Sequence, residues 1–406
     1  MRITARRIVL VVVLGVFMVN GDPHVFCMMI CDVRVMSGYC LGSSWLESAV
    51  SEGRIVGDVA ADQVQPSSFE PVLSDEGYVL DAELNGLFRP ERRRKIESSL
   101  EDLDESRRDP VDLSGGYELK RGFTYLLRLD EQILVGDDEY VKGSPKSSLG
   151  RLFLHTRLLA DYNLGFDEIH PHGEGALDLY VLVQPLVFNV VVAPGYALNQ
   201  LRWFKGVGAR VGPDALQDRH ASTPLLYEDG GDGLEASTLT VSDSVYLHLD
   251  LSGYGDDDVV GLRAKRTPQP IDIRVTGEYD MQRYFEPVTS VKGEVEVKSR
   301  EYYLFGSKEV FDMPEDLSAE AYQHSSTGIS GPLHFAGFID NGFQGNLVFE
   351  VRSDEMSNMR IFDGMPISKV DFYETEDAGK QYGDRIGSNY DGQRRIQVAK
   401  YFSSSL

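Results

Sequence analysis

A short polar segment in the first half of the chain carries side chains suited to hold phosphate. It reads Ser144-Pro145-Lys146-Ser147-Ser148-Leu149-Gly150-Arg151. The Lys and Arg side chains can neutralise phosphate oxygens, and the adjacent hydroxyls can donate hydrogen bonds to them. Serine-rich turns are also common, so an ordinary surface turn is the alternative interpretation of this segment.

A second segment, in the last third of the chain, combines a glycine-rich turn with an acidic strand. The run Gly337-Phe338-Ile339-Asp340-Asn341-Gly342-Phe343-Gln344-Gly345 predicts a β-hairpin whose glycines let a ligand approach the backbone. Ten residues beyond Asp340, Glu350 stands among apolar neighbours. A buried carboxylate needs a partner or a raised pKa, which suits a general base. The alternative is a glutamate on the solvent face of an edge strand.

The two segments belong to an internal repeat. Glu118-Leu119-Lys120 and Tyr125-Leu126 recur 178 residues later as Glu296-Val297-Lys298 and Tyr303-Leu304. At the same offset, the second copy has Ser325-Ser326 where the first has Ser147-Ser148. Further on, Val183 aligns with Val351 and Gly195 with Gly364, so the second copy is shorter by about ten residues. The sustained offset predicts a duplicated β-domain.

The elements that must position these residues are mainly short strands separated by Gly, Pro and Asp turns, a pattern typical of barrels and sandwiches. We expect five segments along the chain. They are a signal-like or wrongly assigned start (1–35), an N-terminal helix with an extended stretch and a charged helix or linker (36–110), a first β-domain (111–215), an acidic glycine-rich linker or insert (216–265), and a second β-domain with a C-terminal tail (266–406).

The composition argues against some classes of binding partner. The chain has 406 residues and a formal net charge of −24, which argues against nucleic-acid polymers and anionic membranes. A small anionic ligand can still be held by a few local cations. All three cysteines, Cys27, Cys31 and Cys40, lie in the first 40 residues, so the rest offers neither a thiol nucleophile nor a disulfide. This pattern suits the cytoplasm.

The N-terminal residues instead have a pattern typical of exported proteins. Arg2, Arg6 and Arg7 precede an apolar run from Ile8 to Val19, which is the layout of a secretory signal. The run is too short to span a bilayer. We favour a translation start at Met28 or Met36, with the upstream stretch being an artefact.

The polar motifs give the sequence a specific resemblance. Lys-Ser-Ser-Leu-Gly-Arg at 146–151, Phe-Ile-Asp-x-Gly-Phe-x-Gly at 338–345 and Val-Phe-Glu at 348–350 resemble the signatures of the dCTP deaminase/dUTPase family. The run 382–393 is similar to that family's nucleotide-closing tail, and Gln65-Pro66-Ser67-Ser68-Phe69-Glu70 resembles another of its motifs, with Glu in place of Asp. The likeness covers about Ser44 to Phe402 and matches the duplicated bacterial form.

The resemblance implies a fold and a set of roles. The fold would be mainly β, with two dUTPase-like β-barrel or clip domains and short helices. Glu350 would move protons while water replaces the amino group of dCTP, giving dUTP and ammonia. Ser147 and Arg151 would position that water. The implied nucleotide-binding residues are Lys146, Ser148, Asp340, Phe349, Tyr382, Asn389 and Gln393.

Each copy departs from the family pattern at one position. Leu182 stands in copy 1 where copy 2 has Glu350, and Ile329 stands in copy 2 where copy 1 has Arg151. Because family active sites lie between neighbouring copies, we expect one hybrid site that takes Ser147 and Arg151 from copy 1 and Glu350 from copy 2. Decay to a protein that binds or senses nucleotides without catalysis is the competing interpretation.

Other chemistries fit the sequence less well. Zinc-dependent nucleobase deaminases need a Pro-Cys-x-x-Cys after their His-x-Glu, and no cysteine follows Cys40, so zinc is not expected. Hydrolysis of dUTP, alone or combined with deamination, is the second choice, and a secreted structural β-protein is the last. The resemblance also implies Mg²⁺ bound mainly through the substrate triphosphate, dTTP as an inhibitor, and a homo-oligomer such as three chains forming two rings.

Overall fold

The structure of the chain is a computed structural model. It describes residues 14–19, 22–27, 38–81, 94–103, 105–163, 165–173, 175–229, 234–239, 241, 244–253, 258–323, 336–353, 357–383 and 388–403. Among these residues, no helix is both long enough and apolar enough to cross a bilayer. The chain divides into two units, Met1–Ser37 and Gly38–Leu406.

The first unit contains one antiparallel pair of strands, β1 (Leu14–Val19) and β2 (Asp22–Cys27). This pairing takes up part of the apolar run that has the layout of a secretory signal. It does not test where translation starts, so the assignment of residues 1–35 stays a prediction.

The second unit is mainly β, as the sequence predicts, and its helices are short. The helices are α1 (Ser43–Ser51), α2 (Ile96–Glu101), α3 (Ser147–Gly150) and α4 (Pro213–Ser222), with 3-10 turns at Ala61–Gln63, Glu105–Arg107 and Met281–Arg283. The strands up to residue 205 are β3 (Tyr39–Leu41), β4 (Ile55–Val56), β5 (Leu73–Leu80), β6 (Arg108–Asp112), β7 (Tyr117–Leu119), β8 (Thr124–Ile133), β9 (Glu139–Pro145), β10 (Leu154–Ala160), β11 (Glu168–Ile169), β12 (Leu177–Pro185), β13 (Val190–Val192) and β14 (Asn199–Lys205). The later strands are β15 (Leu226–Asp229), β16 (Leu234–Ala236), β17 (Val245–Asp250), β18 (Val259–Ala264), β19 (Ile271–Asp272), β20 (Phe285–Thr289), β21 (Glu294–Val297), β22 (Tyr302–Asp312), β23 (Leu317–Gln323), β24 (Phe338–Ile339), β25 (Gln344–Arg352), β26 (Met359–Phe362) and β27 (Pro366–Glu376).

Strand register confirms the repeat. In copy 1, β8 pairs with β12 so that Leu126 lies opposite Leu182. In copy 2, β22 pairs with β25 so that Leu304 lies opposite Glu350. The turn before each long strand is held in the same way, since the backbone N–H of Lys120 donates to the hydroxyl of Tyr125 and that of Lys298 donates to the hydroxyl of Tyr303. Position 182 is therefore the structural counterpart of position 350.

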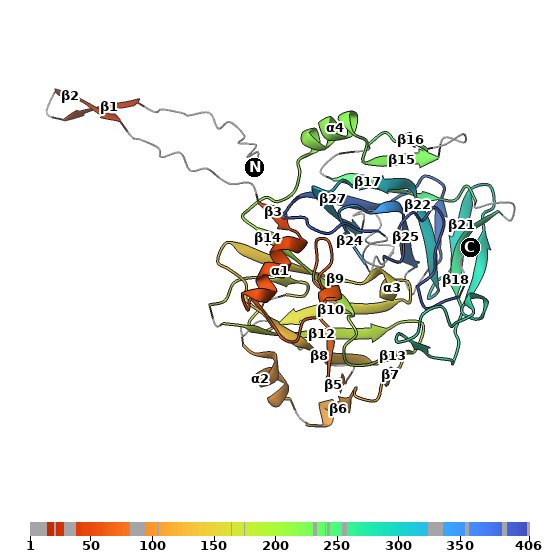
Figure 1. Cartoon of the computed structure of the whole chain (residues 1–406). Helices are drawn as coiled ribbons and strands as arrows, with labels where there is room; N and C mark the ends of the chain where they lie inside the picture. The colour runs from red at the N-terminus through yellow and green to blue at the C-terminus, as the bar shows by residue number, and fades with distance from the viewer. Residues whose placement is uncertain are drawn as a thin grey trace. The chain divides into compact units, whose positions relative to one another are not determined.

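The two copies share one continuous sheet and an apolar interface. Strand β3 pairs with β14 of copy 1 on one side and, in parallel, with β27 of copy 2 on the other. Figure 1 shows copy 1 in orange to yellow-green beside copy 2 in green to blue. Leu304 and Val348 of copy 2 pack into the same core cluster as the inner face of copy 1. Apolar burial therefore joins the copies within one chain.

The segment 216–265, expected as an acidic linker or insert, contributes strands to copy 2. Strand β17 pairs with both β22 and β27, and β18 pairs with β20 and β22. Its apolar residues Val245, Leu247 and Leu249 alternate in β17 and are buried, as a half-buried strand requires.

Helix α2 covers the face of copy 1 that carries Leu182, the counterpart of Glu350. The stretch was expected to be a solvated charged helix or linker, yet Ile96 and Leu100 are buried. They form a cluster with Leu80, Leu126, Leu159 and Tyr180, and Leu182 packs against it. The stretch is mostly charged in composition, but the helix has one apolar face, formed by Ile96 and Leu100. Copy 1 thus has part of a small hydrophobic core at the position where copy 2 has a carboxylate.

This packing predicts the effect of restoring the acid in copy 1. Leu182→Glu would place a carboxylate under α2 and remove apolar contacts, so we expect the free energy of unfolding to fall by about 1–3 kcal/mol. Urea denaturation measures this change. Leu182→Met keeps the volume and should cost less than about 1.5 kcal/mol. Equal stability of the Glu and wild-type proteins would contradict the assigned packing.

Candidate functional site

The copy 1 segment 146–151 forms a tight helical turn at the edge of a pocket. Strand β9 ends at Pro145, Lys146 precedes α3, and Arg151 follows it. Ser148 and Arg151 are buried, whereas Ser147 is half-buried. The four polar side chains of this segment, from Lys146, Ser147, Ser148 and Arg151, line a cavity of about 280 Å³. Copy 2 and the C-terminal segment supply most of the opposite wall.

Glu350 of copy 2 lies against this helical turn. A Cβ atom on Gly150 would stand 2.7 Å from the Glu350 Oε1 atom, so only glycine leaves room for the carboxylate. Glu350 is 2% exposed and belongs to the face of β25 that looks toward copy 1, as does Val348. It is not among the residues that line the cavity itself. The Glu350 carboxylate thus contacts the helical turn at Gly150, which lies between the two serines and Arg151 in the sequence.

Arg151 is held by the C-terminal segment. Its guanidinium lies 3.6 Å from the ring centroid of Tyr390 and donates to the backbone oxygen of Gln397 at 2.8 Å. Both terminal nitrogens also lie 3.3 Å from Gln393 Oε1. The hydroxyls of Ser148 and Tyr390 are 2.7 Å apart. The tail therefore packs directly on the residues that the first motif supplies.

The run 337–345 is not the hairpin that the sequence predicts, because β24 pairs with β23 and β25 with β22. Its glycines Gly342 and Gly345 make room for the tail. A Cβ on Gly342 would stand 3.1 Å from the Tyr382 backbone nitrogen, and one on Gly345 would stand 3.0 Å from the Gln393 backbone oxygen. Both glycines have positive φ. The ring of Phe343 packs edge-on against that of Tyr382, 5.4 Å between centroids. Burial raises the pKa of Tyr382, so its hydroxyl stays protonated.

Asp340 is anchored by a buried arginine that the sequence motifs do not reveal. The Asp340 carboxylate accepts from the hydroxyl of Ser67 at 2.7 Å and from Arg202 Nη2 at 2.9 Å. Arg202 is 0% exposed, donates to the backbone oxygens of Ala319 and Ile339, and stacks 4.2 Å from the ring of Phe338. Arginine is almost never fully buried without such partners.

Arg202→Lys should lower the free energy of unfolding by about 2–4 kcal/mol, although it preserves the charge. A single ammonium cannot serve the Asp340 carboxylate and two carbonyl oxygens in the fork geometry of a guanidinium, and each buried acceptor left unpaired costs about 1–3 kcal/mol. Urea denaturation gives the value. Arg210→Lys, at an exposed Arg210–Asp371 pair, is the matched control and should stay within about 0.5 kcal/mol. Equal losses in both variants would contradict the anchoring role.

Two lysines add to the positive charge that Arg151 brings to the pocket. Lys146 forms an ion pair with Glu70, the residue that stands where the family motif has Asp. Lys400, which the motifs do not single out, also lines the cavity. Burial lowers the pKa of Lys400, the nearby Lys146 lowers it further, and Glu70 opposes the shift. The two lysines share the single carboxylate of Glu70, so phosphate oxygens would add the negative charge that balances the second lysine.

Eight of the ten predicted site residues line the cavity, whereas Glu350 lies against Gly150 outside the lining and Phe349 lies elsewhere. The cavity is lined by Lys146, Ser147, Ser148, Arg151, Asp340, Tyr382, Asn389 and Gln393, all predicted from the sequence. Phe349 points the other way along its strand and lies in the core of copy 2. Asn389 and Gln393 belong to the docked tail. The repeat partners Ser325-Ser326 and Ile329, and tail residues 384–387, lie outside the described residues.

The acidic residues of the pocket do not form a ready-made cation site. Its carboxylates belong to Asp62, Glu70 and Asp340, of which Glu70 is paired with Lys146 and Asp340 with Arg202. Among the described residues, no group of three His, Cys, Asp or Glu side chains is arranged to hold a metal ion. A magnesium ion carried by a substrate's own phosphate oxygens fits this arrangement.

Comparison with known proteins assigns both halves of the chain to the same kind of protein. Residues 38–207 match the model of the 2′-deoxycytidine 5′-triphosphate deaminase N-terminal domain, and residues 213–402 match that of its C-terminal domain. A protein of Methanosphaerula palustris named "dCTP deaminase, dUMP-forming" is 30% identical over 131 residues, which are 32% of this chain and 70% of that protein. One of the same name from Methanoregula boonei is 29% identical, over 33% of this chain and 82% of that protein.

A solved structure extends the likeness to nearly the whole chain. The 2′-deoxycytidine 5′-triphosphate deaminase of Agrobacterium tumefaciens superposes with a TM-score of 0.75 at 25% identity. The match covers 84% of this chain and 99% of that one. The dUTPase-like β fold expected from the motifs is thereby confirmed.

Proposed function

Because the chain belongs to the dCTP deaminase family, we propose that it hydrolyses dCTP to dUTP and ammonia in the supply of dUTP and dTTP precursors. The reaction takes place in the pocket between the two copies. The observation that carries the proposal is the contact between the Glu350 carboxylate and Gly150, next to Ser147 and Arg151. Copy 2 thus supplies an acid–base group to the polar residues of the copy 1 turn.

Glu350 acts as the general base, without zinc. It takes a proton from water as the water oxygen bonds to C4 of cytosine, and it passes this proton to the ring nitrogen N3. It then takes the proton of the new C4 hydroxyl and passes it to the departing amine, so that the C4–N4 bond breaks and ammonia leaves a C4 carbonyl. Ser147 and Arg151 hold the water and stabilise the negative charge that develops. The buried setting of Glu350 favours this shuttling, because burial disfavours a permanent charge.

The remaining pocket residues bind the nucleotide. Asp340, fixed by Arg202 and Ser67, accepts a hydrogen bond from the deoxyribose hydroxyl. Lys146, Lys400 and the hydroxyl of Ser148 hold phosphate oxygens, with Tyr382, Asn389 and Gln393 closing over them. The triphosphate would carry its own magnesium ion, which would offset the rest of its charge.

A second hydrolysis is the other candidate function. The relatives cited above are named as dUMP-forming, which favours a protein that also splits dUTP into dUMP and pyrophosphate. That step needs a water near the α-phosphate. The same site would serve both steps, because Glu350 lies against the turn whose Lys146 and Ser148 would hold the phosphates.

Product analysis tests the proposal. The full chain is incubated with dCTP and magnesium while ammonia is measured and nucleotides are separated by chromatography. Ammonia with dUTP supports deamination, and ammonia with dUMP and pyrophosphate supports the combined activity. If dCTP raises the melting temperature without releasing ammonia, the protein is a nucleotide-binding regulator and the proposal fails.

Three further features rest on the same family assignment and stay proposals. We place the enzyme in the cytoplasm, where its buried free thiol, Cys40, would stay reduced. We expect a homo-oligomer, which sedimentation would measure. Inhibition by dTTP would appear as a rise in the apparent KM for dCTP.

A further inference from the structure

A large basic cleft lies at the junction of the two copies, away from the nucleotide pocket. Its volume is about 1090 Å³, and it shares no lining residue with that pocket. Six cationic side chains line it, against two acidic ones, Glu286 and Glu301. The six are Arg121, Arg263, Lys265, Arg266, Arg300 and Arg352. Such a concentration of positive charge stands out in a chain whose net charge is −24.

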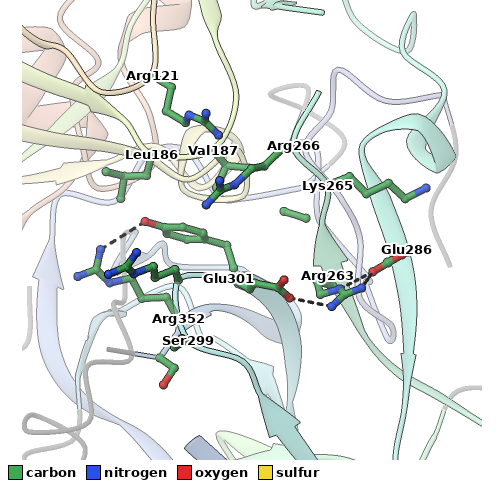
Figure 2. Close-up of a pocket in the computed structure, with 14 residues that line it drawn as sticks. Arg121, Leu186, Val187, Arg263, Lys265, Arg266, Glu286, Ser299, Glu301 and Arg352 are labelled. Carbon is green, nitrogen blue, oxygen red and sulfur yellow. Dashed lines mark hydrogen bonds and ion pairs between the residues drawn. The ribbon is translucent and has the colours of Figure 1, made fainter. Parts of the chain in front are cut away.

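The two acidic groups are engaged by a single arginine. Arg263 pairs with Glu286 and, at 2.8 Å, with Glu301, as Figure 2 shows. Lys265 donates to the backbone oxygen of Gln282 at 2.6 Å. Since the carboxylates already have a partner, they do not cancel the charge of the other arginines.

The other arginines of the cleft form no ion pair with these two carboxylates. Arg121, Arg266 and Arg300 form no ion pair with any residue that the structure describes. Arg352 donates to the hydroxyl of Tyr302 at 3.3 Å, and its Nε is buried with no acceptor in the described part of the chain. Figure 2 shows Arg121 and Arg266 on one side of the cleft and Arg352 on another.

Arg300 is retained in a conformation that costs stability. Its φ is 60°, whereas the equivalent residue of copy 1, 178 positions earlier, is Gly122 with a φ of 88°. The turn is built alike in both copies, because Asn189 Oδ1 accepts from the Arg121 N–H and Asn358 Oδ1 from the Ser299 N–H, each at 3.0 Å. Glycine suits this left-handed position, and arginine does not. Strained non-glycine residues concentrate at functional sites.

We propose that this cleft binds a phosphorylated small molecule at a second site, separate from the nucleotide pocket. Guanidinium groups match phosphate oxygens in charge and fork geometry. The volume of about 1090 Å³ is slightly above the range of small-molecule pockets, roughly 300–1,000 Å³. Long polyanions such as nucleic acids are disfavoured, because the acidic remainder of the chain repels them.

Calorimetric titration of the full chain with inorganic tripolyphosphate tests the proposal. The double variant Arg266→Ser/Arg300→Gly should weaken binding at the cleft at least tenfold. Its melting temperature should match or exceed that of the wild type, since glycine fits position 300. Lys146→Met is the control for the nucleotide pocket, and it should leave the cleft binding intact.

Three results would overturn the proposal. They are absence of binding to the wild-type chain at millimolar tripolyphosphate, an unchanged titration of the double variant, and complete loss of binding in Lys146→Met. The first two remove the cleft as a site, and the third assigns all binding to the nucleotide pocket. None of them depends on whether dCTP is turned over.

Discussion

Glu350→Gln should lower kcat for ammonia release from dCTP by about 10³-fold, within the 10²–10⁴ range typical of a lost general base. The amide is nearly the same size as the carboxylate and leaves Gly150 in place. It cannot accept a proton from water, however, so the attack on C4 loses its base. The assay is a steady-state measurement of ammonia with saturating dCTP and magnesium. Binding of dCTP, measured by calorimetry, should change little.

The matched control is another buried glutamate of copy 2. Glu309 is 3% exposed and pairs with His248, on a strand that does not line the nucleotide pocket. Glu309→Gln should keep wild-type kcat even where it lowers the melting temperature. If both variants lose activity alike, or if Glu350→Gln keeps more than a tenth of wild-type kcat, Glu350 is not the base.

Gly150→Ala should reduce kcat about 10²-fold without unfolding the protein. The added methyl group would lie 2.7 Å from Glu350 Oε1, far inside van der Waals contact, so the carboxylate must move. A displacement of about 1 Å at a reacting group costs on the order of 10²-fold. Gly150 does not have a positive φ, so alanine brings no backbone strain. Measuring kcat beside the melting temperature separates displacement of the carboxylate from loss of fold.

Gly115→Ala controls for the loss of a glycine. Gly115 also lacks a positive φ, and a Cβ atom added to it would have no described neighbour within 4 Å. This variant should keep full activity. A Gly150→Ala protein as active as Gly115→Ala would contradict the close approach of Glu350 to α3.

Much of this architecture could be predicted from the sequence, because repetition and turn chemistry are local signals. The 178-residue offset between Glu118 and Glu296 indicates the duplication, and strand register confirms it. The same offset and the shorter loop of copy 2 make Leu182 the counterpart of Glu350, as the pairing with Leu126 and Leu304 shows. The polar pocket residues can be predicted because they stand in compact motifs.

Other features depend on tertiary contacts that a linear pattern does not carry. Arg202 lies in an almost fully buried strand, and nothing around it in the sequence indicates that its partner is Asp340, 138 residues away. In helix α2, charged residues surround the buried Ile96 and Leu100 in the sequence. The composition therefore predicts a helix exposed to solvent on every face. The motif groups Phe349 with its neighbour Glu350 at the nucleotide, whereas the structure places Phe349 in the core of copy 2, because successive strand residues face opposite ways.

A complementation assay tests the central claim, that one chain builds its site from both of its copies. Arg151→Ala and Glu350→Ala, each expected to be inactive, are unfolded together, refolded as a mixture and assayed for ammonia release from dCTP beside wild type treated in the same way. Since Gly150 and Glu350 meet within a single chain, the mixture should stay as inactive as either variant alone. Recovery of a substantial fraction of wild-type activity would contradict the account, because it would require Arg151 and Glu350 to come from different chains.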